Sequence, residues 1–329
     1  MSALAPTLEA FFTDRLINQR DASPHTIAAY RDTFRLLLVF IHNQTGKPPS
    51  ALDVSDLDSS RVTAFLDHLE RERNNSPRTL NTRLAAIHSL FRFAALRHPE
   101  HADVIARVLA VPAKRFERAI VTYLTAPEVD ALLAAPDQTR WIGRRDHALL
   151  AVAIQTGLRV SELTALRCQD VQLTTGPHVR TTGKGRKQRA TPLTASTVAV
   201  LRAWLQERRG QPEDPVFPTS RGRPLSRDAI ALLVTKHTDA ARRSCTTLNA
   251  KSISPHVLRH TAAMNLLRAG VDSTVIALWL GHESVETTQI YIHADMTIKE
   301  RALARTAPPN SKPGRYRPTD GLLAFLEGL

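Results

Sequence analysis

Three Ser-Pro dipeptides each precede a run of apolar residues at helical spacing, and this pattern limits the possible fold more than any other feature of the chain. The dipeptides begin at Ser23, Ser76 and Ser254. Serine is a good N-cap, and proline is tolerated in the first turn of a helix, where its missing N–H would have no partner. After Ser76, for example, Leu80 and Leu84 begin a stripe of apolar side chains. The sequence therefore predicts a mainly helical protein.

Changes in this pattern divide the chain. Residues 1–111 read as helices only, and residues 112–124 form a basic, proline-containing linker. Residues 125–306 contain further helices around a stretch rich in Thr, Val and Gly at 170–193, which predicts two or three short strands with tight turns. Residues 307–329 are a polar, basic tether with an apolar end.

The predicted fold class is therefore mainly α with a small antiparallel β-sheet in the C-terminal domain (α+β). The 329 residues suffice for two domains, each with its own core. After the strands, helices are expected at 194–209, 226–243, 255–269 and 272–280.

Composition favours a polyanionic partner. The chain has 44 Lys and Arg residues against 31 Asp and Glu, which gives a formal net charge of +13. Nucleic acid is the leading candidate, although a membrane surface could also attract such a chain. We find no apolar run long enough for a membrane span and no N-terminal secretion signal, so we expect a soluble, cytoplasmic protein. Two distant cysteines, Cys168 and Cys245, argue against a disulfide framework or a Cys-ligated zinc site.

The helix that begins at Ser254 carries a cationic cluster. His256, Arg259 and His260 are three to four residues apart and share one helix face. Positive side chains at a helix N-terminus predict an anion site, and phosphate is the candidate. We expect His260 to face the interior or a neighbouring side chain more than the anion itself.

Four separated segments contain residues suited to phosphate chemistry. They are "TGLRVSEL" with Arg159, "GKGRKQR" with Lys184, "HVLRH" with His256 and Arg259, and "LGHESVETTQIYIH" with His282 and Tyr291. In order and approximate spacing, these six residues resemble the catalytic set of the tyrosine recombinases, the family of phage integrases and Xer-like enzymes. The resemblance covers nearly the whole chain. It implies a helical, SAM-like core-binding domain followed by a catalytic domain, arranged as a C-shaped clamp around duplex DNA.

The residue types fit the chemistry that the resemblance implies. Attack on a phosphodiester adds negative charge to its nonbridging oxygens, and the planar guanidinium groups of Arg159 and Arg259 are suited to hold them. His256 could donate to the phosphate or accept the nucleophile's proton. The resemblance implies that Lys184 is the general acid, although Lys187 is a rival by sequence alone.

The resemblance further implies that His282 binds the transition-state phosphate and that Tyr291 is the nucleophile. We expect the cations to make the Tyr291 phenol more acidic. The implied reaction passes through a 3′-phosphotyrosyl link and a Holliday junction, and it needs no cofactor, no ATP and no metal ion. The implied partners are double-stranded DNA with specific recombination sites and three further copies of the chain in a synaptic homo-tetramer. A related recombinase could also take part. Integration, excision or transposition of a mobile element and resolution of chromosome dimers would all use this set.

Further residues are predicted to bind DNA or another protomer. Arg78 and Arg83 lie on the basic face of the helix after Ser76. The hairpin residues expected to grip the DNA backbone are Arg186, Lys187 and Arg189. The apolar residues expected to dock on a neighbouring protomer, or on their own catalytic domain, are Leu322, Leu323, Phe325 and Leu326.

Three other functions fit part of the sequence. A type IB topoisomerase would use nearly the same residues to relax DNA. A DNA-binding regulator would use residues 284–291 as the recognition helix of a helix-turn-helix, but this leaves Arg159, Lys184 and His256 unexplained. A metal-dependent phosphoesterase would use several histidines but lacks carboxylates at matching positions. Its histidines would be His256, His260, His282 and His293.

Overall fold

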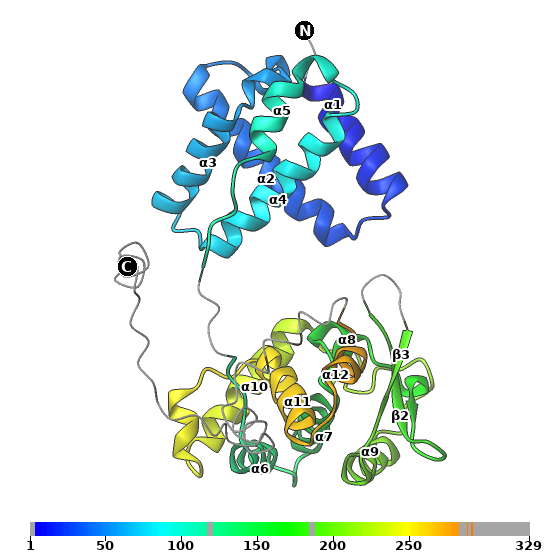
Figure 1. The fold of residues 1–329 in the computed structure, drawn as a ribbon. Coiled ribbons are helices and arrows are strands. Elements are labelled where there is room, and N and C mark those ends of the chain that lie inside the picture. Colours follow the sequence, from blue (N-terminus) through cyan, green and yellow to red (C-terminus); the bar gives the residue numbers. More distant parts are fainter. Residues whose placement is uncertain (1–3, 117–120, 184–187, 283–287, 289–290, 292–329) are drawn as a thin grey trace, which may run out of the picture. The chain divides into compact units, whose positions relative to one another are not determined.

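The computed structural model describes residues 4–116, 121–183 and 188–282, together with Thr288 and Tyr291. The chain divides into two compact units, Met1–Arg118 and Ala119–Leu329 (Figure 1). Each unit has its own apolar core. Within the described residues, no helix is long and apolar enough to cross a membrane.

The first unit is helical throughout its described part. Its helices are α1 (Leu4–Ala10), the π-helical η1 (Phe11–Gln19), α2 (Pro24–Thr45), α3 (Ser59–Arg71), α4 (Pro77–Ala94) and α5 (Ala102–Leu109). Short 3₁₀ turns are η2 (Pro49–Ala51), η3 (Val54–Asp56) and η4 (Pro99–His101). The two predicted Ser-Pro starts are confirmed, since the Ser23 and Ser76 side chains accept from the backbone N–H groups of Thr26 and Thr79.

The predicted apolar stripe of α4 forms part of the first core. Leu80, Leu84 and Ile87 are buried and pack with aromatic side chains from the other helices, such as Phe34 and Phe65. Burial of this stripe removes a large apolar area from water, which accounts for most of the stabilisation of such a helix.

The second unit consists of seven α-helices in its described part and a small sheet. The helices are α6 (Ala126–Ala134), α7 (Trp141–Thr156), α8 (Val160–Ala165), α9 (Ala195–Arg208), α10 (Arg227–Ala241), α11 (Pro255–Arg268) and α12 (Ser273–Leu280). The 3₁₀ turns η5 (Cys168–Asp170) and η7 (Thr246–Ala250) lie between them. The helices expected after the strands are thus confirmed.

The predicted short strands are also confirmed. They are β1 (Val171–Gln172), β2 (His178–Thr182) and β3 (Gln188–Pro192). The sheet is antiparallel in the order β1-β2-β3, and Thr181 pairs with Arg189. The fold is therefore mainly helical with one small antiparallel sheet, as expected.

The central helix α7 positions the site. Most of its residues are buried, and it packs against α11 (Figure 1). It ends at Gly157, whose backbone has a φ of +66°. A Cβ at this position would lie 2.6 Å from Leu280 Cδ2 and 3.0 Å from the Cβ of Ala262. The absence of a side chain thus lets the α7–α8 turn approach α11 and α12 closely.

Gly157→Ala should destabilise the second unit by about 3 kcal/mol, because it combines left-handed backbone strain with overpacking. Gly270→Ala is the matched control. Gly270 has a φ of +84°, but a Cβ there would meet nothing within 4 Å. The Gly270→Ala substitution should lower the free energy of unfolding by only about 1 kcal/mol. Urea unfolding of both variants measures the difference, and equal losses would contradict the close approach at Gly157.

Candidate active site

Arg259 is anchored between the ends of two helices. It lies on α11, its residue is 3% exposed, and its two terminal nitrogens donate to the backbone oxygens of Gly157 (2.7 Å) and Leu280 (2.8 Å). Burial, followed by the positive charge of Arg159, lowers the pKa of Arg259 to about 10. The guanidinium therefore stays charged at neutral pH, and its orientation is fixed by backbone groups.

Arg159 is anchored beside it. This residue precedes α8, and its Nη2 donates to the backbone oxygen of Gly281 (2.7 Å). Its Nη1 donates to Glu162 Oε1 (3.1 Å). The side chain is 34% exposed, so part of the guanidinium is accessible to an anion. Both arginines are thus held at successive carbonyls at the end of α12.

Glu162 connects the arginines and was not identified from the sequence. Its side chain is 3% exposed, and its Oε2 accepts from the backbone N–H of Arg159 (2.7 Å). It also forms a two-pronged ion pair with Arg189, in which Nη1 and Nη2 donate to Oε1 (2.8 Å) and Oε2 (2.7 Å). The signal that could have revealed it is the spacing of Arg159 and Glu162, since a glutamate three residues after a helix N-cap reaches back to the cap's backbone.

The charge state of Glu162 follows from these contacts. Burial alone would raise the pKa of its carboxyl group, but the bonds from Arg189 and from the Arg159 backbone, with both positive charges, outweigh burial. The net effect is a lowered pKa. The carboxylate is therefore ionised at neutral pH and stabilises two guanidinium groups that would otherwise repel each other.

The position of Arg189 differs from the expected one. The sequence placed this residue among the hairpin cations that grip the DNA backbone, but its side chain is only 12% exposed and binds Glu162. The reason is that a buried carboxylate requires a charged partner, and a guanidinium supplies two parallel donors. Arg189 thus belongs with Arg159 to the arginines that bind Glu162, and it is not an exposed phosphate contact.

Glu162→Gln should lower the stability of the second unit by about 3 kcal/mol at pH 7, because it leaves a buried guanidinium without its counter-charge. The folded-state pKa of Glu162 is below its ordinary value of 4.5, so its contribution is present above that pH and is lost as the pH falls through the folded pKa. The stability difference between variant and wild type should therefore shrink in acid. DNA cleavage should slow by roughly tenfold to 100-fold, because Arg159 loses the carboxylate that holds its Nη1 and keeps only the bond to Gly281.

Glu207→Gln is the matched control for this prediction. Glu207 also binds one arginine through two bonds, since Nε and Nη2 of Arg144 donate to it at 2.7 and 2.6 Å. Both side chains are about one third exposed, so water replaces the lost bonds at little cost. Urea unfolding at several pH values and a cleavage assay would compare the two variants. Equal behaviour would rule out the role given to Glu162.

Tyr291 contacts two histidines, and a third lies beside one of them. Its Oη is 2.9 Å from His260 Nδ1, and the ring of His282 is stacked beside it with centroids 6.4 Å apart. The ring of His256 contacts that of His260 edge to face, with centroids 4.2 Å apart. His282 Nδ1 is also 2.8 Å from Thr288 Oγ1. The structure therefore brings the predicted nucleophile and both predicted histidines together, and it adds His260.

The pKa of Tyr291 shifts in the direction opposite to the one expected. Its side chain is buried, with the residue 1% exposed, and burial raises the pKa to about 12 against the lowering effect of Arg259. The expectation that nearby cations acidify this phenol is thus wrong for this arrangement, since desolvation of the phenolate outweighs their charge. Tyr291 is fully protonated at neutral pH.

The remaining predicted residues lie elsewhere. In the first unit, Arg78 is exposed on α4, whereas Arg83 is half-buried and burial lowers its pKa. The predicted residues outside the described ones are Lys184, Arg186, Lys187, His293, Leu322, Leu323, Phe325 and Leu326. Within the described ranges, no three His, Cys, Asp or Glu side chains are grouped as a metal site requires.

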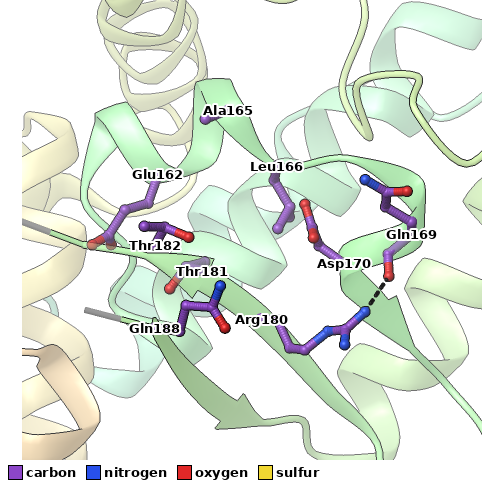
Figure 2. Close-up of a pocket in the computed structure, with 9 residues that line it drawn as sticks. All are labelled: Glu162, Ala165, Leu166, Gln169, Asp170, Arg180, Thr181, Thr182 and Gln188. Carbon is purple, nitrogen blue, oxygen red and sulfur yellow. Dashed lines mark hydrogen bonds between the residues drawn. The ribbon is translucent and has the colours of Figure 1, made fainter. Parts of the chain in front are cut away.

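Figure 2 shows a polar cavity of about 370 Å³ between α8 and the strands β2 and β3. Glu162 and Thr182 lie at one end, and Arg180, which donates to the backbone oxygen of Gln169 (3.0 Å), lies toward the other. Thr181 also lines the cavity. The carboxylate that binds the arginines thus borders a polar space large enough to hold water.

Comparison with known proteins identifies the family. Residues 122–297 match the phage integrase family, and residues 10–98 match the N-terminal SAM-like domain of phage integrases. The chain belongs to the phage integrase family of tyrosine recombinases. This membership confirms the resemblance noted from the four segments, and site-specific DNA recombination is the activity of the family to which this recombinase belongs.

Relatives cover nearly the full length of the recombinase. It is 55% identical over 328 residues to the integrase/recombinase y4rC of Sinorhizobium fredii, covering 100% of this chain and 99% of the relative. It is 34% identical over 316 residues to the tyrosine recombinase XerC of Pelobacter propionicus, covering 94% and 99% of the two chains.

Solved structures share the fold of this recombinase. The XerH recombinase bound to a palindromic difH substrate has a TM-score of 0.68 and 24% identity, covering 87% of this chain and 81% of that one. The lambda integrase dimer bound to a COC′ core site has a TM-score of 0.62 and 18% identity, covering 89% and 77%.

Proposed function

We propose that this recombinase cuts and rejoins DNA at specific sites through a 3′-phosphotyrosyl link to Tyr291. The observation that carries the proposal is a pair of anchored guanidinium groups, those of Arg159 and Arg259, together with a tyrosine near Arg259 that contacts His260 and His282. Two fixed cations can neutralise a phosphate that gains charge when it is attacked. The tyrosine supplies an oxygen nucleophile that can hold the DNA end covalently.

The proposed roles follow from exposure and charge. Arg159 and Arg259 bind the nonbridging oxygens of the scissile phosphate. His256, exposed in the first turn of α11, and His282 donate hydrogen bonds to the same phosphate. Lys184 protonates the leaving 5′-oxygen, a role that rests on the family resemblance.

In the proposed cleavage, Tyr291 Oη forms a bond to phosphorus and the bond from phosphorus to the 5′-oxygen breaks. The proton of the phenol must leave, and the 5′-oxygen must gain one. The 5′-hydroxyl of a partner strand then attacks the phosphotyrosine, which rejoins DNA and restores the phenol. The bond energy is retained in the covalent link, so this sequence of steps consumes no ATP.

The burial of Tyr291 places a condition on this reaction. A residue that is 1% exposed cannot reach a DNA phosphate without a local rearrangement. We infer that productive DNA binding exposes the phenol. This rearrangement also separates DNA binding from cleavage, which limits cutting outside an assembled complex.

The proposed partner is double-stranded DNA, bound through phosphate contacts from exposed basic residues. Arg78 and the half-buried Arg83 in the first unit and the hairpin residues Arg186 and Lys187 remain the candidates, and the excess of positive charge supports them. The XerH and lambda integrase structures are of DNA-bound recombinases, and the latter is a dimer on its site. We extend this to a homo-tetramer that pairs two sites, with the tail residues 322–326 docked on a neighbouring protomer or on their own domain.

The biological role that we propose is integration, excision or transposition of a mobile element through a Holliday junction. The relative in Sinorhizobium fredii that is named integrase/recombinase supports this choice over resolution of chromosome dimers. The DNA substrate also supports the cytoplasmic location expected from the sequence.

The test is a suicide substrate that carries a nick near the candidate site, taken from the DNA that flanks the gene. Cleavage then releases a short fragment, religation fails, and the covalent complex accumulates. We expect a protein-DNA band on a denaturing gel and a nucleotide-modified peptide that contains Tyr291. DNA binding without any covalent band would instead favour the regulator. Relaxation of supercoiled plasmid without strand exchange would favour the topoisomerase.

A further inference from the structure

The phenol of Tyr291 already has a hydrogen-bond acceptor. Its Oη lies 2.9 Å from His260 Nδ1, and the two rings meet edge to face with centroids 5.4 Å apart. A phenol O–H is a much stronger donor than a neutral imidazole N–H, and an unprotonated imidazole nitrogen is the stronger acceptor. We therefore assign Tyr291 as the donor and His260 as the acceptor. The proton that must leave the nucleophile is directed at Nδ1, and this contact must persist when DNA binding exposes the phenol.

His260 is available as an acceptor at neutral pH. Burial, followed by electrostatic interactions with His256, Arg259 and His282, lowers the pKa of His260 to about 4. Its imidazole is thus neutral, and so is the phenol. Because the pKa of the phenol is about 12 and that of the imidazole about 4, transfer before the attack is unfavourable, and proton transfer must accompany bond formation to phosphorus. The negative charge that then develops on the phosphate offsets the repulsion between a protonated His260 and Arg259.

The two histidines of α11 occupy different environments. His256 is exposed in the first turn of the helix, whereas His260 is half-buried one turn later and contacts the phenol. Their rings meet edge to face at 4.2 Å. One helix face therefore holds an imidazole accessible to a DNA phosphate and another in contact with the nucleophile.

We propose that His260 is a catalytic residue that accepts the Tyr291 proton as Oη attacks phosphorus, while His256 serves the phosphate. This inference rests on the proposed function. The Oη–H bond breaks as the Oη–P bond forms, and Nδ1 takes the proton. The bond from phosphorus to the 5′-oxygen breaks, and that oxygen takes its proton from the general acid. In religation the protonated His260 returns its proton to the departing phenol, so the same residue serves both directions.

The test separates proton acceptance from positioning. In His260→Gln, the amide oxygen can still accept a hydrogen bond from Tyr291, but an amide does not take up a proton at neutral pH. Covalent-complex formation on the suicide substrate should slow on the order of 100-fold. Site-specific replacement of Tyr291 by 3,5-difluorotyrosine, whose phenol is more acidic, should restore much of the rate in His260→Gln. The same replacement should change the rate of the protein with His260 intact far less.

His147→Gln is the matched control. His147 lies on α7 in the same unit, is half-buried, and its Nδ1 is 2.8 Å from the backbone oxygen of Leu133. This variant should cleave at the wild-type rate. DNA affinity and melting temperature, measured for every variant, detect any loss of folding.

Two results would overturn the proposal. One is a folded His260→Gln protein that forms the covalent complex as fast as the wild type. The other is a slow His260→Gln protein whose rate does not rise when Tyr291 is replaced by 3,5-difluorotyrosine, which would make His260 a positioning residue. Absence of a covalent complex with the wild-type protein would instead refute the proposed function itself. The wild-type reaction thus distinguishes the two failures.

Discussion

Tyr291→Phe protein should form no detectable covalent complex with the suicide substrate, while it binds the same DNA with unchanged affinity. The substitution removes the one oxygen that the proposed mechanism makes nucleophilic. It also leaves His260 Nδ1 without the partner it has at 2.9 Å. The cost in stability should be only about 1 kcal/mol, since a single hydrogen bond of neutral groups is lost.

Tyr123→Phe is the matched control, because it removes a phenol hydroxyl from the same unit. The Tyr123 hydroxyl accepts from Arg268 Nη2 at 2.8 Å, and its residue is half-buried. This protein should lose a similar amount of stability and cleave normally. A covalent band from Tyr291→Phe would show that another residue is the nucleophile. Full biological activity of Tyr291→Phe would favour a DNA-binding regulator.

Arg259→Lys should slow cleavage by about 1,000-fold, although the positive charge is retained. The guanidinium of Arg259 donates to Gly157 O and Leu280 O at the same time, and it must also face the phosphate. A lysine ammonium is a single point that cannot satisfy both carbonyls and bind phosphate in the same geometry. Single-turnover cleavage with saturating protein would measure the loss. A scissile methylphosphonate, which lacks one anionic oxygen, should reduce the deficit.

Arg145→Lys is the control for the loss of a buried guanidinium. Arg145 is 8% exposed and donates to Asp146 Oδ1 (2.9 and 2.6 Å) and to the backbone oxygen of Pro218 (2.9 Å). Both lysine variants should melt at lower temperature than the wild type. Only Arg259→Lys should cleave slowly once the fraction of folded protein is taken into account. Equal cleavage by the two variants would contradict the role of Arg259.

Local sequence signals were sufficient to predict the elements of the fold. Ser23 and Ser76 cap helices as expected because a serine N-cap depends on atoms only three residues away. The strands between residues 170 and 193 were predicted for a similar reason, since a high content of Thr, Val and Gly and tight turns are local features. Neither prediction required knowledge of distant contacts.

The details of the site depend on tertiary structure and were harder to predict. Glu162 is a carboxylate in a site for an anion, which its residue type alone would argue against. Its role becomes clear only when Arg159 and Arg189 are seen to share it. The pKa of Tyr291 was expected to fall because the sequence reveals nearby charges but not the burial that outweighs them. The direct contact between His260 and the phenol was not predicted either, since residues 260 and 291 meet only in the folded chain.

The two arginines are held by main-chain carbonyls of Leu280 and Gly281, and this has a consequence for how such a protein can diverge. A carbonyl is the same in every residue, so the anchoring requires a helix end of a given shape but no particular side chain at position 280. Related chains could therefore exchange Leu280, which is fully buried, for other apolar residues that fill the same space beside Gly157. The positions of the two guanidinium groups would not change with such substitutions, because backbone carbonyl groups hold them.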